Sequence, residues 1–330
     1  MGCPVGIGPE IILKYFNLTS QQKNHTAIVI GDINVLKRCR DELGFNDLEP
    51  VSWERDQDLE NGQIAVIDTS HLDPAQLQWG KPNRDTGRAA GSYVEKGVRL
   101  IQQGILESIV TCPLSKESLN MGGFPFPGHT EMLAQLTNCR DYAMMLAGDK
   151  LRVTLATIHC PLKEVVNKLD QDTIVQLIRT TNRALTVDLG IEEPKIAVAG
   201  LNPHGGEHGL FGDEEEKIIE PAIIAAKSED IKVDGPFPPD TIFIKAASGD
   251  YHAVVCMYHD QGLIPFKLLH FSDGVNITLG LPIIRTSVDH GTAYDIAGRG
   301  IAEPTSLIQA IRLAQDIATN RRKHSSIIVQ

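Results

Sequence analysis

Short runs of β-branched and apolar residues alternate along the chain with longer amphipathic segments. Runs bounded by turn residues are typical of buried strands, and the amphipathic segments between them are typical of helices. The predicted strands are 27–30, 64–67, 108–111, 153–157, 195–199 and 253–257, and the clearest predicted helices are 86–103, 172–185, 214–227 and 306–320. This alternation predicts an α/β fold with a mostly parallel sheet covered by helices on both faces.

Composition narrows the classes of function. The net charge of -11 argues against an extended polyanion as partner, so no nucleic-acid binding is expected. The apolar runs are too short to cross a bilayer, and no basic-then-apolar leader opens the chain, so no membrane association is expected. Six cysteines without a C-x-x-C pair indicate reduced thiols and a cytoplasmic location.

Three histidines stand just past predicted strands: His159, His204 and His259. In parallel sheets the functional residues gather beyond the carboxyl ends of the strands, so these side chains could converge. Neutral imidazole is the commonest ligand of zinc and similar metals, and three protein ligands leave positions open for substrate oxygens. Taken singly, each could equally be a hydrogen-bonded structural histidine.

A second candidate is the segment 127–131, which leads into an apolar run. Thr130 is expected to cap a helix there, and backbone N–H groups with His129 could hold a phosphate. The alternative is a capped helix that binds nothing.

The densest segment is 258–291, in which Lys267, Asn276 and Arg285 recur among glycine and apolar residues. Two cations and an amide donor suit a phosphate monoester, because arginine grips two oxygens and lysine adds a point charge. Solvated surface cations are the alternative for the lysine and the arginine.

Upstream of this segment, the residues from Gly235 to Asp240 are expected to form a stiff turn.

Glycines near the start do not form a dinucleotide-binding fingerprint. Gly6 and Gly8 are followed by Ile11 where a third glycine would fall. The segment is instead expected to be a loop feeding a helix that starts near Pro9.

The chain resembles the 4-hydroxythreonine-4-phosphate dehydrogenase family along essentially its whole length. The resemblance rests on motifs that occur in the family's order, at 6–10, 200–204, 235–241, 257–262, 276–282 and 289–292. It implies a fold like that of isocitrate and isopropylmalate dehydrogenases, with two α/β/α subdomains and an active-site cleft between them. The expected subdomains are 1–125 with 295–330, and 126–294, which would carry the metal and substrate residues and the dimer interface.

Site residues follow from the same resemblance. His159, His204 and His259 correspond to ligands of one divalent metal (zinc, magnesium or cobalt), and the substrate-binding positions correspond to His129, Thr130, Lys267, Asn276 and Arg285. A homodimer is implied, with its active site at the subunit interface. The family usually begins with a strand and Gly-Asp-Pro-Ala-Gly, so a first strand is expected to be missing here, and Cys3 replaces an acidic residue.

The implied reaction is the NAD- or NADP-dependent oxidation of the C3 hydroxyl of 4-phosphohydroxy-L-threonine to 2-amino-3-oxo-4-phosphooxybutanoate. That β-keto acid decarboxylates to 3-amino-2-oxopropyl phosphate in pyridoxal phosphate biosynthesis. The residues do not single out the general base, for which Asp240, Asp289 and Lys267 are candidates. Alternative functions are a 4-phospho-D-threonate or 4-phospho-D-erythronate dehydrogenase, and a metal-dependent phosphohydrolase or non-catalytic metabolite binder.

Overall fold

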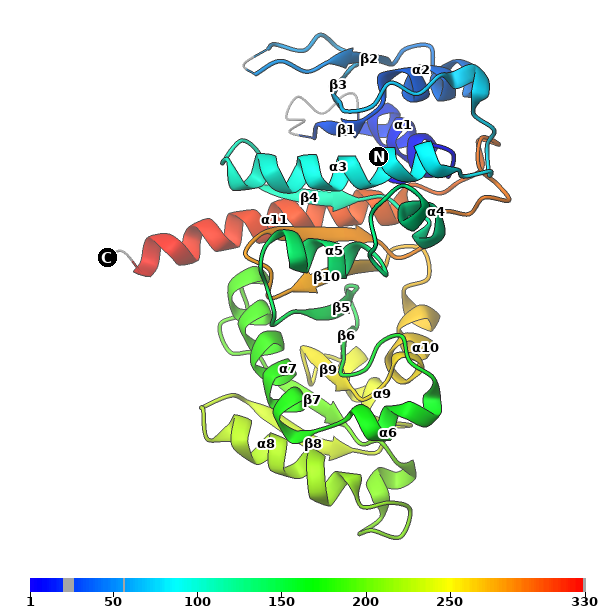
Figure 1. Cartoon of the computed structure of the whole chain (residues 1–330). Helices are drawn as coiled ribbons and strands as arrows, with labels where there is room; N and C mark the ends of the chain where they lie inside the picture. The colour runs from blue at the N-terminus through cyan, green and yellow to red at the C-terminus, as the bar shows by residue number, and fades with distance from the viewer. Residues whose placement is uncertain (20–26, 56, 329–330) are drawn as a thin grey trace. The chain divides into compact units, whose positions relative to one another are not determined.

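A computed structural model describes residues 1–19, 27–55 and 57–328 of the chain. The chain divides into two compact units (Figure 1). The first comprises Met1–Asn138 and Arg285–Ala314, and the second comprises Cys139–Ile284 and Gln315–Gln330.

The first unit is built on a three-stranded parallel sheet of order β1-β3-β2, and two further strands, β4 and β11, pair with each other. Its elements, in chain order, are α1 (Gly8–Thr19), β1 (Val29–Gly31), α2 (Ile33–Leu43), β2 (Glu49–Ser52), β3 (Gln63–Asp68), α3 (Arg84–Gln102), β4 (Ser108–Thr111), α4 (Lys116–Met121), α5 (His129–Leu136), β11 (Ile284–Val288) and α11 (Thr305–Ile328), the last of which runs on into the second unit.

Local sequence explains where helices of this unit begin and end. Asp32 caps α2, because its side chain accepts the N–H groups of Asn34 and Val35 at 3.0 and 3.2 Å. The same helix ends at Gly44, whose φ of 74° is the left-handed conformation that glycine adopts without a Cβ clash.

The second unit holds strands in the order β10-β5-β6-β9-β7-β8. Strands β6, β9, β7 and β8 run parallel, whereas β5 is antiparallel to both β10 and β6. Its elements are β5 (Ala143–Ala147), β6 (Arg152–Leu155), α6 (Val165–Lys168), α7 (Gln171–Arg183), β7 (Ile196–Ala199), α8 (Glu220–Lys227), β8 (Val233–Phe237), α9 (Ile242–Ala247), β9 (Ala253–Cys256), α10 (His259–Leu269) and β10 (Val275–Leu279).

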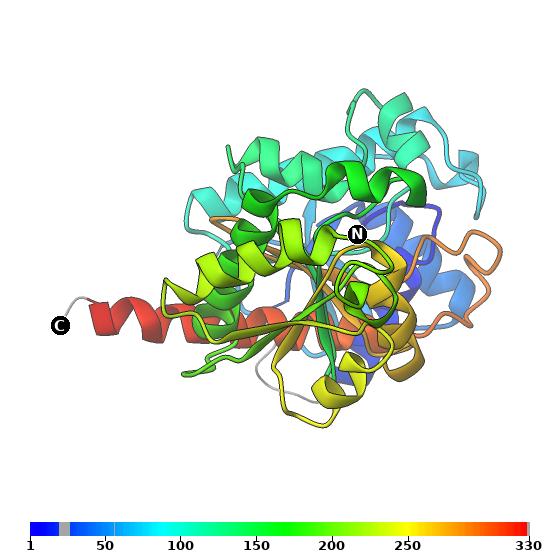
Figure 2. The ribbon, with the colours of Figure 1, turned by 90° about the horizontal axis from the view of Figure 1, so that it is seen from below.

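Helices cover both faces of this sheet. Val153 and Leu155 of β6 pack into one apolar cluster with Ile242 of α9 and Phe266 of α10. Thr154, which lies between them and points to the opposite face, accepts a 3.1 Å hydrogen bond from the Thr181 hydroxyl of α7. Figure 2 shows α7 and α8 on one side of the strands and α9 and α10 on the other. Alternate residues of β6 therefore face helices on opposite sides of the sheet.

The predicted α/β fold class is confirmed, and each predicted strand and helix has a counterpart. Strands β2, β5, β8, β10 and β11 were not predicted. The prediction of a stiff turn from Gly235 to Asp240 was wrong for its first three residues, because these residues belong to β8, which extends to Phe237. In the described ranges, no helix is both long and apolar enough to span a membrane.

Candidate functional site

The three predicted metal-binding histidines all lie in the second unit, after three neighbouring strands. His159 follows β6, His259 is the first residue of α10 directly after β9, and His204 follows β7. Because β6, β9 and β7 are adjacent and parallel, their carboxyl ends meet at one edge of the sheet. The ring centres of His159 and His259 are 5.7 Å apart, with 41° between the ring planes.

This pair suits a shared metal ion. Imidazoles that bind one ion through bonds of about 2.1 Å have ring centres roughly 5 to 6 Å apart. The Nδ1 atom of His259 hydrogen-bonds Oδ1 of Asp260 at 2.7 Å, which favours the tautomer that leaves Nε2 as the metal-binding atom. A carboxylate behind an imidazole is the usual support of a metal-bound histidine.

His204 occupies a strained position in the loop after β7. It lies in the short 3-10 turn Pro203–Gly206 with a left-handed φ of 55°, and its ring centre is 6.1 Å from that of Phe211. Within the described residues, no three metal-ligating side chains of one chain gather around a common point. The donor pair fits a divalent metal, and the third ligand stays a prediction.

Two predicted substrate residues of the first unit are the buried Arg285 and the half-buried His129, whose Nε2 atom is buried. Arg285 is only 4% exposed and donates from Nε and Nη2 to Thr111 Oγ1 at 3.2 and 2.8 Å, so it is not a surface cation. Burial lowers the pKa of Arg285 to about 10. The pKa of His129 is held well below its usual range, first by burial and then by the charge of Arg285, so this imidazole is neutral near pH 7.

The cap of α5 differs from the expectation. The helix begins at His129 with Gly128 as its N-cap, and Thr130 is its second residue. Thr130 is therefore not the capping residue. Its backbone N–H nevertheless lies in the first turn, where helical N–H groups lack intrahelical partners.

The remaining predicted substrate residues lie in the second unit. Lys267 is half-buried in the last turn of α10, and its ammonium lies 5.9 Å from the centre of the Phe271 ring. Asn276 belongs to β10, opposite Leu146 of β5.

Buried polar atoms without a hydrogen-bond partner mark two of these positions. In the described part of the chain, such side-chain atoms are His129 Nε2, Asn276 Oδ1 and His290 Nε2. An unpaired buried polar atom costs about 1 to 3 kcal/mol, and it is commonly paired by a ligand or by water. Two of the three atoms belong to residues that the sequence predicts to contact substrate.

The two carboxylates that are candidates for the general base differ in exposure. Asp240 is exposed, whereas Asp289 is half-buried and its backbone N–H donates to Ser306 Oγ at 3.1 Å. Cys3, which stands where the family has an acidic residue, is buried and accepts a 3.3 Å hydrogen bond from the Tyr294 hydroxyl. Burial raises the pKa of the Cys3 thiol, so it does not replace the negative charge of a carboxylate.

Two further residues around the histidines had no predicted role. Gln261 is buried in the first turn of α10 and contacts the backbone at the ends of both β9 and β7. Glu215 is buried and accepts N–H groups of the loop that carries His204. Their roles depend on how the loops after β7 and β9 fold against them, so no sequence motif indicates them.

Comparison with known proteins identifies the family of this chain. Residues 23–314 match the family of the pyridoxal phosphate biosynthetic protein PdxA. The chain belongs to the PdxA family. A 4-hydroxythreonine-4-phosphate dehydrogenase of Desulforapulum autotrophicum is 51% identical over 97% of this chain and 94% of its own length.

Other members of the PdxA family carry different names. A D-threonate 4-phosphate dehydrogenase of Pectobacterium atrosepticum is 45% identical over 96% of this chain and 98% of its own length. The crystal structure of 4-hydroxythreonine-4-phosphate dehydrogenase from Klebsiella pneumoniae aligns with a TM-score of 0.84 at 43% identity, covering 96% of each chain. The relatives of this chain are thus named for two different phosphorylated acids.

Proposed function

We propose that this chain is a divalent-metal-dependent NAD(P) dehydrogenase of 4-phosphohydroxy-L-threonine. It oxidises the C3 hydroxyl to give 2-amino-3-oxo-4-phosphooxybutanoate, which loses carbon dioxide to give 3-amino-2-oxopropyl phosphate in pyridoxal phosphate biosynthesis. Family membership and the names of the 51% and 52% identical relatives support this substrate.

The observation that carries the proposal is the pair of unsatisfied atoms, His129 Nε2 and Asn276 Oδ1. Both are buried, and both belong to the substrate-binding set that the sequence predicts. A substrate with hydroxyl and ammonium groups has donors for acceptor atoms of this kind, and a hydrogen bond to such a donor removes the cost of leaving a buried atom unpaired.

The phosphate of the substrate would be bound by cationic side chains and by the N-terminus of α5. Arg285 offers a guanidinium whose burial strengthens its attraction for an anion. Lys267 adds a second positive charge, and the N–H groups at His129 and Thr130 add backbone donors. His129, being neutral, contributes a hydrogen bond rather than a charge.

His159, His204 and His259 would hold the metal. A divalent ion held by imidazoles lowers the pKa of a hydroxyl that it binds and polarises a neighbouring carbonyl. The Asp260 carboxylate orients the His259 ring for this role through its 2.7 Å hydrogen bond.

Oxidation moves two electrons and a proton from C3. The hydride passes from C3 to the nicotinamide ring of NAD or NADP, and the hydroxyl proton passes to a base among Asp240, Asp289 and Lys267. The resulting ketone lies β to the carboxylate, so the C1–C2 bond breaks with release of carbon dioxide. Its electron pair passes to the ketone as an enolate, and C2 then takes up a proton to give the amino ketone.

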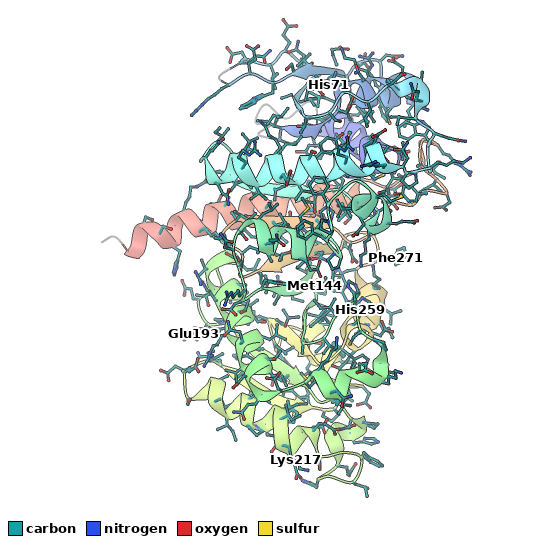
Figure 3. All side chains as sticks on the ribbon, viewed as in Figure 1. His71, Met144, Glu193, Lys217, His259 and Phe271 are labelled. Carbon is teal, nitrogen blue, oxygen red and sulfur yellow. The ribbon has the colours of Figure 1, made fainter. Side chains whose placement is uncertain are left out.

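We also infer that the active enzyme is a homodimer. Ile264, Leu268 and Phe271 recur on one side of α10 and just beyond it, and they are 61, 81 and 81% exposed. Figure 3 labels Phe271 just beyond one end of this helix and His259 at the other. A second copy that covers this apolar face would pack along the helix that begins with a predicted metal ligand, which supports an active site near the interface between subunits.

The nearest alternative is the oxidation of 4-phospho-D-threonate or 4-phospho-D-erythronate, which relatives named for D-threonate 4-phosphate favour. A phosphohydrolase or a non-catalytic metabolite binder is the other alternative. A location in the cytoplasm and the absence of a nucleic-acid partner stay predictions of the composition.

One assay separates these functions. The purified protein is incubated with each of the three phosphorylated acids and with NAD or NADP, with and without a chelator, while nicotinamide absorbance and free phosphate are followed. Chelator-sensitive reduction that is fastest with 4-phosphohydroxy-L-threonine supports the proposal. A faster rate with phosphothreonate or phosphoerythronate overturns the choice of substrate, and phosphate release without reduction overturns the dehydrogenase.

A further inference from the structure

Buried polar side chains join the three loops that carry the predicted metal ligands. The hydroxyl of Thr157, two residues before His159, donates to the backbone oxygen of Met257 at 2.8 Å, and Met257 stands two residues before His259. The loop after β6 is thereby tied to the loop after β9.

Gln261 makes the corresponding tie between β9 and β7. Its Oε1 accepts the N–H of Met257 at 2.7 Å, and its Nε2 donates to the backbone oxygen of Gly200 at 2.7 Å. Both polar ends of this 7% exposed amide are therefore used on backbone groups of two different strand ends. One end anchors the segment that leads into His259, and the other anchors the segment that leads into His204.

Glu215 holds the far side of the His204 loop. This 2% exposed carboxylate accepts the N–H groups of Leu201 and Asn202 through Oε1 at 2.7 and 2.8 Å, and its Oε2 accepts from Asn202 Nδ2 at 2.9 Å. A Cβ on Gly206 would come within 2.7 Å of the same Oε2, so the loop closes tightly around the carboxylate.

His204 itself shows why such support is needed. Its φ of 55° is left-handed, a conformation that a residue with a Cβ adopts only when its surroundings impose it. The bonds from Gln261 and Glu215 are made to Gly200, Leu201 and Asn202, which lie two to four residues before this position. They therefore oppose relaxation of the loop that presents the imidazole.

We propose that Gln261 and Glu215, here named the loop clip, are positioning residues that set the His204 loop relative to His259 before metal binds. The inference rests on the proposed three-histidine metal site and adds to it the residues that hold its ligands in place. Removing a hydrogen-bond partner of a metal-binding side chain commonly changes metal affinity 10- to 100-fold, and we expect a change of similar size from residues that fix the backbone leading to the ligand.

The test measures Co²⁺ binding to the full-length protein after chelator treatment, by titration of the visible absorption bands of the bound ion. Gln261→Met removes both hydrogen bonds and keeps an unbranched side chain of similar length. Gln261→Glu keeps an acceptor for Met257 but loses the donor to Gly200. The exposed Gln171 at the start of α7 supplies the matched control Gln171→Met.

Glu215 provides an independent pair of variants. Glu215→Gln retains an oxygen for the two backbone N–H groups, whereas Glu215→Ala removes every acceptor. The exposed neighbour Glu216 gives the control Glu216→Ala. Circular dichroism establishes which variants remain folded. If Gln261→Met or Glu215→Ala unfolds, the milder variants Gln261→Glu and Glu215→Gln still test the inference.

The inference predicts that both Gln261 variants and Glu215→Ala bind Co²⁺ at least ten-fold more weakly and with altered bands. Glu215→Gln should stay within a few-fold of the original protein, and the controls should not change. Co²⁺ affinity and bands like those of the original protein in a folded Gln261→Met or Gln261→Glu would overturn the loop clip alone, provided that His204→Ala loses binding. Original protein that binds Co²⁺ no better than His204→Ala would overturn the metal site, and the loop clip with it.

Discussion

The imidazole rings of His159 and His259 lie 5.7 Å apart at the ends of two adjacent parallel strands, although they are distant in sequence. This spacing is what two ligands of one metal ion require. The parallel pairing of β6 with β9 brings them together, because a parallel sheet places successive strand ends on the same edge.

Replacing His204 tests the third ligand. His204→Ala should abolish turnover and weaken metal binding, because two imidazoles remain where three are expected. Metal content after dialysis and initial rates measure both effects. His208, which is exposed in the same loop, gives the control His208→Ala. Normal metal content and rate in His204→Ala would remove His204 from the site.

Replacing Arg285 tests the phosphate contact. Arg285→Ala should weaken substrate binding by about 1.5 to 3 kcal/mol, the usual contribution of a charge-assisted hydrogen bond. The Michaelis constant and calorimetric titration with the phosphorylated substrate measure the loss. Arg88→Ala, at an exposed position of α3, should leave both unchanged. Unaltered affinity in a folded Arg285→Ala protein would place the phosphate elsewhere.

The half-buried His129 should make the free protein sensitive to acid. The unfolded chain takes up a proton at this residue near pH 6.5, whereas the folded chain resists it because burial and Arg285 lower the pKa of His129. Stability should therefore be fully present above that pH and should fall on acidification below it, by at most about 1.4 kcal/mol per pH unit from this group.

Urea midpoints at pH 7.5 and at about pH 5.5 measure this effect. His129→Gln, which cannot take up a proton, should show a smaller acid-induced decrease in midpoint than the original protein. The exposed His71 supplies the control His71→Gln, which should keep the original decrease. If the urea midpoint decreases equally in His129→Gln and in the original protein, His129 is not the residue responsible for the sensitivity to acid.

A substitution on the exposed side of α10 tests the inferred dimer. Leu268→Glu places a charge on the apolar face that a second copy is inferred to cover, so it should shift the mass measured by light scattering toward the monomer. Ile224→Glu, at a similarly exposed position of α8, is the control. A Leu268→Glu protein that remains dimeric would show that this face lies outside the interface.

Sequence patterns predicted the strand ends well because buried parallel strands are short apolar runs bounded by turn residues. That placement was enough to locate His159, His204 and His259 after neighbouring strands. It did not predict β5, which runs antiparallel, because an apolar run carries no information about its direction or partners.

Other parts of the site depend on tertiary contacts that a local pattern does not contain. Thr130 was expected to cap α5, but Gly128 takes that position, and glycine and threonine are comparable as caps. The environments of Arg285 and Thr111 arise because β11 and β4 are neighbours, which no spacing in the sequence indicates. The contacts of Gln261 and Glu215 were beyond prediction for the same reason.

The proline in β8 limits how copies of this protein can join. In the second unit β8 ends the strand order, and Pro236 within it has no amide proton to offer to an incoming strand. This edge is thus a poor template for fibrous aggregation. Joining two copies through this edge would leave the backbone ladder interrupted at Pro236, whereas packing between helical surfaces depends on side-chain shape and needs no such ladder.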